Sequence, residues 1–185
     1  IGQETPLRLA RLTAKAPGES VLFPVMGGFS DVRINAYYAD AVRWAVSSGV
    51  TSGTSSTTFS PDVVCTTGEI LTFLWRANGS PTPAESNASV PAGQYYSDAA
   101  NWALEQGLTD TFHADTPATR ADTVTYLWKL AGKPSAKDAV TFADVASGAE
   151  YADAVAWAVE QGITSGTGTN QFSPDVTCTR GQIVT

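Results

Sequence analysis

The sequence is poor in the residues that build metal sites, disulfide frameworks and nucleic-acid surfaces. Its 185 residues include one histidine and two cysteines, and 18 acidic side chains outnumber 11 basic ones, which gives a formal net charge of −7. Cys65 and Cys178 supply neither the paired spacing of a zinc site nor a disulfide framework. The excess of acid leaves no continuous basic surface for a phosphate backbone, which argues against nucleic acid as a partner.

Long apolar runs are also missing. No stretch approaches the roughly 20 residues that span a bilayer, and the N-terminus lacks the charged, apolar and small-residue segments of an export signal. We therefore expect a soluble segment without membrane insertion, whose export signal lies outside it. The hydrophobic share of 43% is enough to bury a core.

The chain contains a repeat of about 50 residues. Phe29-Ser30-Asp31-Val32 returns as Phe142-Ala143-Asp144-Val145, and Phe59-Ser60-Pro61-Asp62 returns at the same offset as Phe172-Ser173-Pro174-Asp175. A third copy lies between these two, with a shorter loop from Gly107 to Phe112. Repeats at 29–81, 90–134 and 142–185 follow, separated by Pro/Ser/Ala-rich linkers and preceded by an extension, residues 1–28, that has no counterpart in the repeat.

Each repeat carries the pattern of two helices. Apolar spacing followed by a glycine predicts first helices near 39–48, 97–106 and 152–161. The second helices should begin after Thr66, Thr119 and Thr179, each followed three positions later by a capping partner, Glu69, Asp122 or Gln182. A single helix pair cannot bury its apolar face, so we expect a mainly α fold in which three pairs with long loops pack around a pseudothreefold axis as one compact domain. Residues 6–15, which fit either a helix or a strand, are expected to cover the apolar surface left by the short third repeat.

The order Phe-x-Asp-Val, Tyr-Ala-Asp-Ala-Val-x-Trp-Ala, Gly-Val/Ile-Thr-Ser-Gly-Thr, Phe-Ser-Pro-Asp and Thr-Arg-Gly-Gln resembles the S-layer homology (SLH) domain over residues 29–185. The resemblance implies an extracellular module of the bacterial cell surface whose grooves bind a secondary cell-wall polymer, often pyruvylated and linked to peptidoglycan. It attributes binding to Thr119-Arg120 and Thr179-Arg180. Two departures from the family pattern concern the sites: Thr67 replaces arginine in the first repeat, which is expected to weaken that groove, and the third repeat stops at Thr185, within its second helix.

Arg120 and Arg180 are expected at the first position of a helix, where a cation opposes the helix macrodipole. One interpretation is a salt bridge to a neighbouring acid or an extended side chain with an exposed head group. The other is an anion site, in which free amides at the helix N-terminus and the guanidinium bind a carboxylate together.

Other candidate residues fit both a structural and a functional interpretation. Tyr37 and Tyr95, at a position where the family often has tryptophan, fit packing and sugar contact equally well. Gly53 and Gly166 fit either ligand-facing amides or a turn that requires a positive φ. Core packing is preferred for three tryptophans, Trp44, Trp102 and Trp157, with core or inter-repeat contacts for Trp75 and Trp128. Turn and capping roles are preferred over calcium binding for four aspartates, Asp31, Asp62, Asp144 and Asp175. Cys65 and Cys178 are expected to be small buried side chains, with a disulfide as the minor alternative.

These patterns favour a non-enzymatic glycan-binding anchor without cofactor or metal. The alternative is a structural or protein-interaction domain that has lost its sites, which the threonine at position 67 would favour. An enzyme is the least favoured class, because His113 is the only histidine and no nucleophile motif is present.

Overall fold

The computed structural model describes residues 28–138 and 141–185, and the segment 6–15 discussed above lies outside them. The first helices of the three repeats are α1 (Ala39–Ser47), α3 (Ser97–Glu105) and α5 (Ala152–Glu160). The second helices are α2 (Thr67–Ala77), α4 (Arg120–Leu130) and α6 (Arg180–Val184). In the described part, β pairing is confined to isolated bridges, so the predicted mainly α fold is confirmed.

All three first helices end at the glycine that the sequence indicates. Gly49 has a φ of 73°, and the amides of Gly49 and Val50 donate to the carbonyls of Val46 and Ala45. This pair of hydrogen bonds is the Schellman arrangement, which needs a residue in the left-handed region. Gly107 and Gly162 close the other two helices with φ values of 66° and 71°.

Each second helix begins with a complete capping box. The hydroxyl of the N-cap threonine accepts the amide of the residue three positions on, whose side chain accepts the threonine amide in return. The box forms with three different partners, Glu69, Asp122 and Gln182. The shorter Asp122 therefore serves as well as the glutamate and glutamine.

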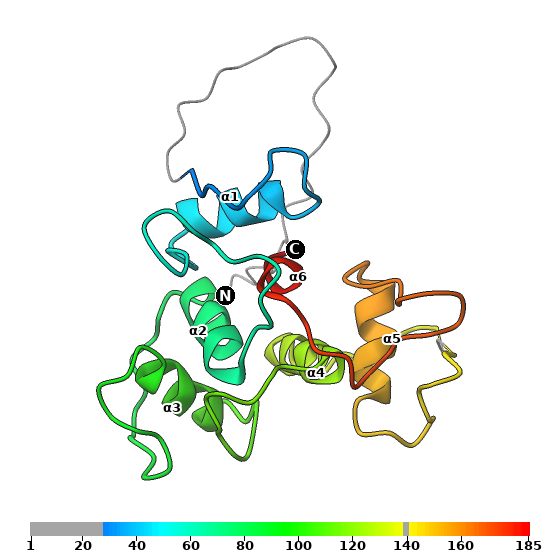
Figure 1. The fold of residues 1–185 in the computed structure, drawn as a ribbon. Coiled ribbons are helices and arrows are strands. Elements are labelled where there is room, and N and C mark those ends of the chain that lie inside the picture. The colour runs from blue at the N-terminus through cyan, green and yellow to red at the C-terminus, as the bar shows by residue number, and fades with distance from the viewer. Residues whose placement is uncertain (1–27, 139–140) are drawn as a thin grey trace, which may run out of the picture.

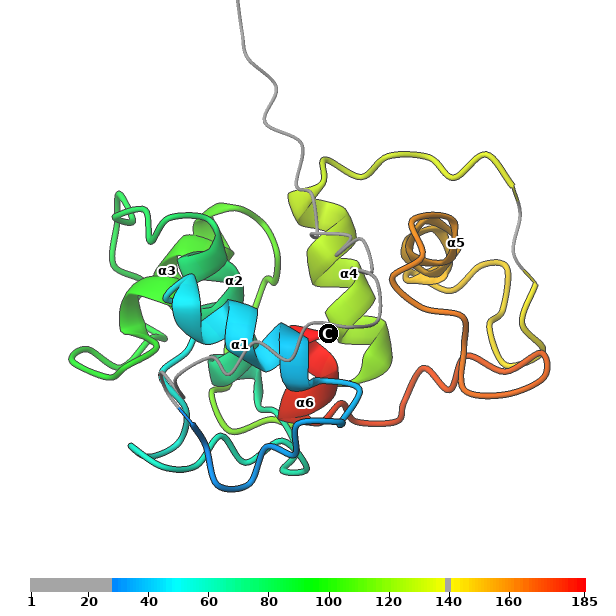
Figure 2. The same cartoon turned by 90° about the horizontal axis from the view of Figure 1, so that it is seen from above.

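Helices pack between repeats. Each second helix packs against the first helix of the next repeat, α2 on α3 and α4 on α5, and α6 returns to pack on α1. Figure 1 shows these three pairs, and Figure 2 shows α4 standing between α5 and the group formed by α1, α2, α3 and α6. The pairing closes into a cycle, which is the order that the expected threefold bundle requires; an exact threefold axis stays a prediction, as does the assignment of the whole to one domain.

The segments that precede the second helices meet at the centre of this cycle. Cys65 donates its amide to the Cys178 carbonyl, Cys178 to Ala118, and Ala118 to Cys65, all at 2.9 Å. The three side chains are almost completely buried, with exposed fractions of 0% for Cys65 and Ala118 and 5% for Cys178. The expected small buried side chains are confirmed, and both cysteines are free thiols. Burial raises the pKa of both thiols.

The apolar core forms two clusters among the described residues. The larger joins α1, α2 and α3 with Val184 of α6, and the smaller joins Val124 of α4 to α5 and Phe172. Trp102 is buried in the first cluster and Trp157 packs against the second, as predicted. Trp44 is 45% exposed, so its predicted core position is wrong. Trp75 and Trp128 pack at the edges of the clusters.

Two aspartates fasten the loops to the start of their repeats. The carboxylate of Asp31 accepts the amides of Phe59 and Ser60 at 2.9 and 2.7 Å. Asp144 accepts those of Phe172 and Ser173 at the same distances. Asp31 and Asp144 therefore have a structural role, but these bonds join segments 28 and 29 residues apart and are not the local turn or cap bonds that were predicted. In the described residues no cluster of three potential metal ligands is found.

Ala118 lies in the buried contact with Cys65 and Cys178, so a larger side chain there should destabilise the protein. Ala118→Leu should lower the free energy of unfolding by about 1–3 kcal/mol, because the closed centre has no room for added methylenes. Ala146→Leu, at an exposed position, is the matched control and should change it by less than about 0.5 kcal/mol. Urea denaturation measures both, and equal effects would show that the centre is not tightly packed.

Because the Asp144 carboxylate accepts two loop amides, we expect the protein to lose stability in acid. The amides of Phe172 and Ser173 hold the pKa of its carboxyl below the usual value. The stabilisation is therefore present above the unfolded pKa of about 3.9 and is lost as the pH falls through the lower folded pKa. Asp144→Asn should lower the melting temperature at pH 6. Between pH 6 and pH 3 the melting temperature of this variant should fall by less than that of the parent protein. Melting curves parallel to those of the parent protein would contradict this, and Asp175→Asn, at an exposed position, serves as control.

Candidate functional site

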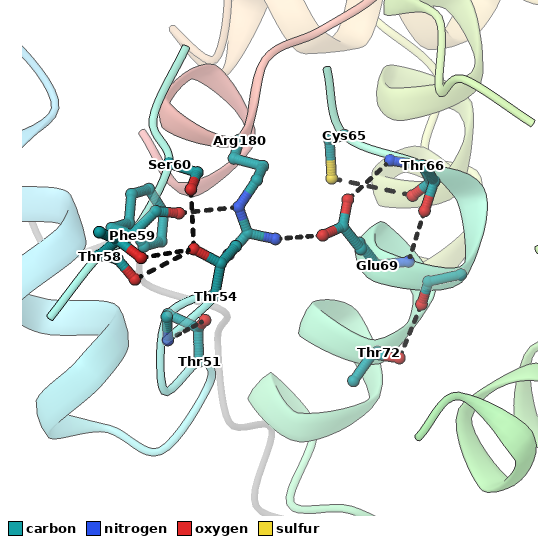
Figure 3. A network of polar contacts seen from close by, with 12 residues as sticks. Thr51, Thr54, Thr58, Phe59, Ser60, Cys65, Thr66, Glu69, Thr72 and Arg180 are labelled. Carbon is teal, nitrogen blue, oxygen red and sulfur yellow. Dashed lines mark hydrogen bonds and ion pairs between the residues drawn. The ribbon is translucent and has the colours of Figure 1, made fainter. Parts of the chain in front are cut away.

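Arg180 reaches from the third repeat into the first. Its Nε donates to the Phe59 carbonyl at 2.9 Å, its Nη1 pairs with Glu69 Oε1, and its guanidinium lies 5.0 Å from the Phe59 ring centre. Only 3% of the residue is exposed. Figure 3 shows the side chain between Phe59 and Glu69. The salt-bridge interpretation therefore describes Arg180 in this structure.

Arg120 makes the corresponding reach from the second repeat into the third. Its Nε donates to the Phe172 carbonyl at 2.7 Å and its Nη2 to Thr164 Oγ1 at 3.1 Å, with the guanidinium 4.8 Å from the Phe172 ring centre. Arg120 is half-buried. Within residues 28–138 and 141–185 no carboxylate lies at ion-pair distance from it.

The expectation of free amides at these helix N-termini is wrong. The amides of the first two residues of α4 and α6 donate to carbonyls of the neighbouring repeat, and the third donates to the threonine cap. The acceptors are Val176 and Pro174 for α4, Val63 and Pro61 for α6, and the caps Thr119 and Thr179. An anion at either position would therefore meet the guanidinium alone, because neighbouring repeats already use the helix amides.

Tyr37 and Tyr95 are the exposed aromatic residues beside the second helices. Their exposed fractions are 66% and 58%, and each ring packs edge-on against the tyrosine that follows it. Partial burial raises the pKa of both tyrosine hydroxyls. The Tyr95 hydroxyl lies beside Gly68 in the first turn of α2, and most of each tyrosine remains accessible.

A groove of about 370 Å³ brings several candidate residues together. We name it the Arg180 groove. Its walls come from three repeats: the first supplies its loop and α2, the second supplies Tyr95, and the third supplies Arg180. The lining residues are Thr51, Ser52, Gly53, Thr54, Glu69, Thr72, Phe73, Arg76, Tyr95 and Arg180. Arg180, Tyr95 and Gly53, which the sequence singled out from three different repeats, therefore share one site.

Gly53 and Gly166 are required by their turns. Their φ values are 85° and 92°, and a Cβ at either would clash with a phenylalanine ring, Phe29 or Phe142, and with a backbone carbonyl. Their amides donate to Thr51 and Thr164. The interpretation as a turn that requires a positive φ is confirmed, and the interpretation as ligand-facing amides is not supported.

By position in the repeat, a corresponding set of residues belongs with Arg120. Arg120 contacts the third-repeat loop through Thr164, whose hydroxyl also accepts the Gly166 amide. Tyr37, Thr179 and Gln182 correspond to Tyr95, Thr66 and Glu69 beside the Arg180 groove. We name these residues the Arg120 site, and Thr119 is the cap that starts the helix bearing Arg120.

Thr67 faces the second repeat, because its Oγ1 donates to the Thr116 carbonyl at 3.0 Å. An arginine at position 67 would therefore reach into the second repeat. Its absence affects the site in the second repeat, and not the groove of the first repeat as the sequence suggested. Glu69, Phe73 and Arg76 were overlooked as lining residues, because alignment of single repeats does not reveal which neighbour a side chain reaches.

The sequence model of the S-layer homology domain matches residues 28–70 and 141–184, the first and third repeats. Domains of this family are in general cell-wall anchoring modules that bind secondary cell-wall polymers, and they occur in surface-anchored proteins of the cell envelope. The match does not include residues 90–134, so the family assignment of the second repeat stays a prediction. A search of curated proteins gives no match. None of the helices in the described segments is long and apolar enough to cross a membrane.

The different partners of the two arginines predict different costs for removing them. Arg180→Ala should lower the free energy of unfolding by about 3 kcal/mol, because it leaves Glu69 as an unpaired, largely buried charge. Arg120→Ala should cost about 1–2 kcal/mol, because it breaks hydrogen bonds to neutral acceptors. Urea denaturation compares the two.

The double variant Arg180→Ala/Glu69→Gln tests the cause. It should recover part of the loss, since a glutamine caps α6 in the same way. Equal costs for the single variants, or no recovery in the double variant, would contradict the buried ion pair.

Proposed function

We propose that this protein is a non-catalytic anchoring module of the bacterial cell surface that binds an anionic secondary cell-wall polysaccharide, which carries pyruvate ketals in many relatives. The observation that carries the proposal is the Arg180 groove, in which a cation, an exposed tyrosine ring and a polar loop converge from three repeats. Apolar ring faces and a few placed polar groups are what a sugar site needs. The family match at both ends of the described chain supports the same function.

The proposal gives the module two binding sites, the Arg180 groove and the Arg120 site. By position in the repeat, three changes fall around the corresponding place in the second repeat. Threonine replaces arginine at position 67, the loop from Gly107 to Phe112 is shortened, and Glu150 stands where the other sites have tyrosine. Loss of the cation, the loop and the aromatic ring together removes each element of the site there.

The alternative is a structural or protein-interaction domain of a surface protein that no longer binds glycan. The observation that favours it is the ion pair between Arg180 and Glu69, which uses the arginine internally. The half-buried Arg120 favours the glycan-binding function, because no described carboxylate lies at ion-pair distance from its guanidinium.

Retention on cell walls tests the function. The protein should sediment with purified sacculi whose secondary polymer is pyruvylated, and should stay in solution once that polymer has been extracted. Tyr95→Ala and Tyr37→Ala should each weaken retention, because each removes a ring that can cover a sugar face. Ile34→Ala, an 89% exposed residue outside both sites, is the matched control.

Two results would contradict the proposal. Equal sedimentation with extracted sacculi would show that the polymer is not the ligand. Absence of sedimentation with intact sacculi, for a protein with a native melting curve, would leave the structural alternative as the better explanation.

A further inference from the structure

Arg76 lies in the last turn of α2 and lines the Arg180 groove. Its Nη1 donates to the Val50 carbonyl at 3.3 Å, just beyond the glycine that ends α1. None of the described carboxylates lies at ion-pair distance from its guanidinium, whereas Arg180 in the same groove is paired with Glu69. Among the residues that line the groove, the one charge left unpaired within the described chain therefore belongs to Arg76.

Lys129 of α4 is the matching residue in the second repeat. Its Nζ donates to the Leu108 carbonyl at 2.9 Å, and Leu108 follows α3 as Val50 follows α1. A hydrogen bond to this carbonyl is therefore the structural role that both cations share. Lysine makes the bond with its single nitrogen, whereas Arg76 keeps two further nitrogens, Nε and Nη2, that have no acceptor among the described residues.

A second hollow, of about 400 Å³, adjoins the Arg180 groove. The hollow and the groove share Thr51, Ser52 and Arg76, so Arg76 stands on the boundary between them. We name it the Phe29 hollow. The residues that line the hollow but not the groove are Phe29, Val46, Gly49 and Ser56. Apolar side chains beside a few polar ones are the composition of a small-molecule site, and the hollow has a volume in the range of such sites.

We propose that the Arg180 groove and the Phe29 hollow form one extended site for two consecutive sugar units of the glycan, and that Arg76 contacts both units. The inference rests on the proposed glycan-binding function and adds the length of glycan that this site takes. A guanidinium directs its N–H donors outward from three nitrogens, so Arg76 can bond to the Val50 carbonyl and still donate to ligand oxygens on either side. A lysine would have to make all of these contacts from one nitrogen.

The length of the preferred ligand tests the extended site. Calorimetric titrations would use glycan fragments of one and two sugars, released from the extracted secondary polymer and sorted by length. All titrations use protein that carries Tyr37→Ala, which weakens the Arg120 site, so that binding in the Arg180 groove dominates. The two-sugar fragment should bind at least about tenfold more tightly than the single sugar, because it also fills the Phe29 hollow.

Ser56→Leu should remove that gain. Ser56 is exposed, and the hydrogen bonds of its loop run among its neighbours Thr54, Ser55 and Thr58. The larger side chain should bring the affinity for two sugars to within about twofold of that for one, and leave the affinity for one unchanged. Thr169→Leu, at the corresponding exposed position of the third-repeat loop, is the matched control and should leave both affinities unchanged.

Arg76→Met and Lys129→Met separate the ligand contact from the structural bond. Each variant loses the matching hydrogen bond to a carbonyl, so the two should lower the melting temperature by similar amounts. Only Arg76→Met should weaken binding of the two-sugar fragment, by at least about tenfold, because it also loses charge-assisted bonds to the ligand.

Equal or undetectable affinities for one and two sugars, or equal effects of Ser56→Leu and Thr169→Leu, would overturn the extended site. Equal losses of affinity in the two methionine variants would overturn the ligand contact of Arg76 and leave it a purely structural residue. If intact sacculi retain the parent protein in these cases, the anchoring function stands and only this inference fails. If the sacculi do not retain it, the function and the inference fail together.

Discussion

The cycle of backbone hydrogen bonds among Cys65, Ala118 and Cys178 is the constraint on which the rest of the structure depends. Each segment gives its amide to one neighbour and its carbonyl to the other, at 2.9 Å in all three cases. In a repeat taken alone these polar groups would face water, so they are paired and buried only when all three repeats come together. Because the cycle fixes where every second helix begins, it also fixes the direction in which the first helical side chain points.

Composite sites follow from that direction. The residue after each cap points into the next repeat, so Arg180 contacts Phe59, Arg120 contacts Phe172 and Thr67 contacts Thr116. The same side chains therefore hold the repeats together and line the sites. A change at such a position alters the neighbour's site, and the stability of the assembly limits how freely the arginines can change.

Local signals made much of the fold predictable. Gly49 ends a helix and Thr66 begins one through bonds to residues within a few positions, so sequence spacing predicts both boundaries to within a residue. Sequence spacing within a repeat could not predict the contacts between repeats. The amides after Thr119 were expected to be free and Trp44 was expected in the core, because a single repeat shows neither the carbonyl of Val176 nor which helix face stays uncovered.

Repeats can diverge in chemistry only where the framework tolerates the change. Asp31 and Asp144 are identical because each ties down a loop through two amides, a task that needs two acceptor oxygens. Glu69 and Gln182 differ because the cap needs only one oxygen. The second oxygen of Glu69 pairs with Arg180 across the repeat boundary, so this cap residue also joins two repeats. An exchange of glutamate for glutamine there would leave the helix start intact but remove an ionic contact between repeats, so divergence at this position is limited by the packing of the repeats and not by the cap.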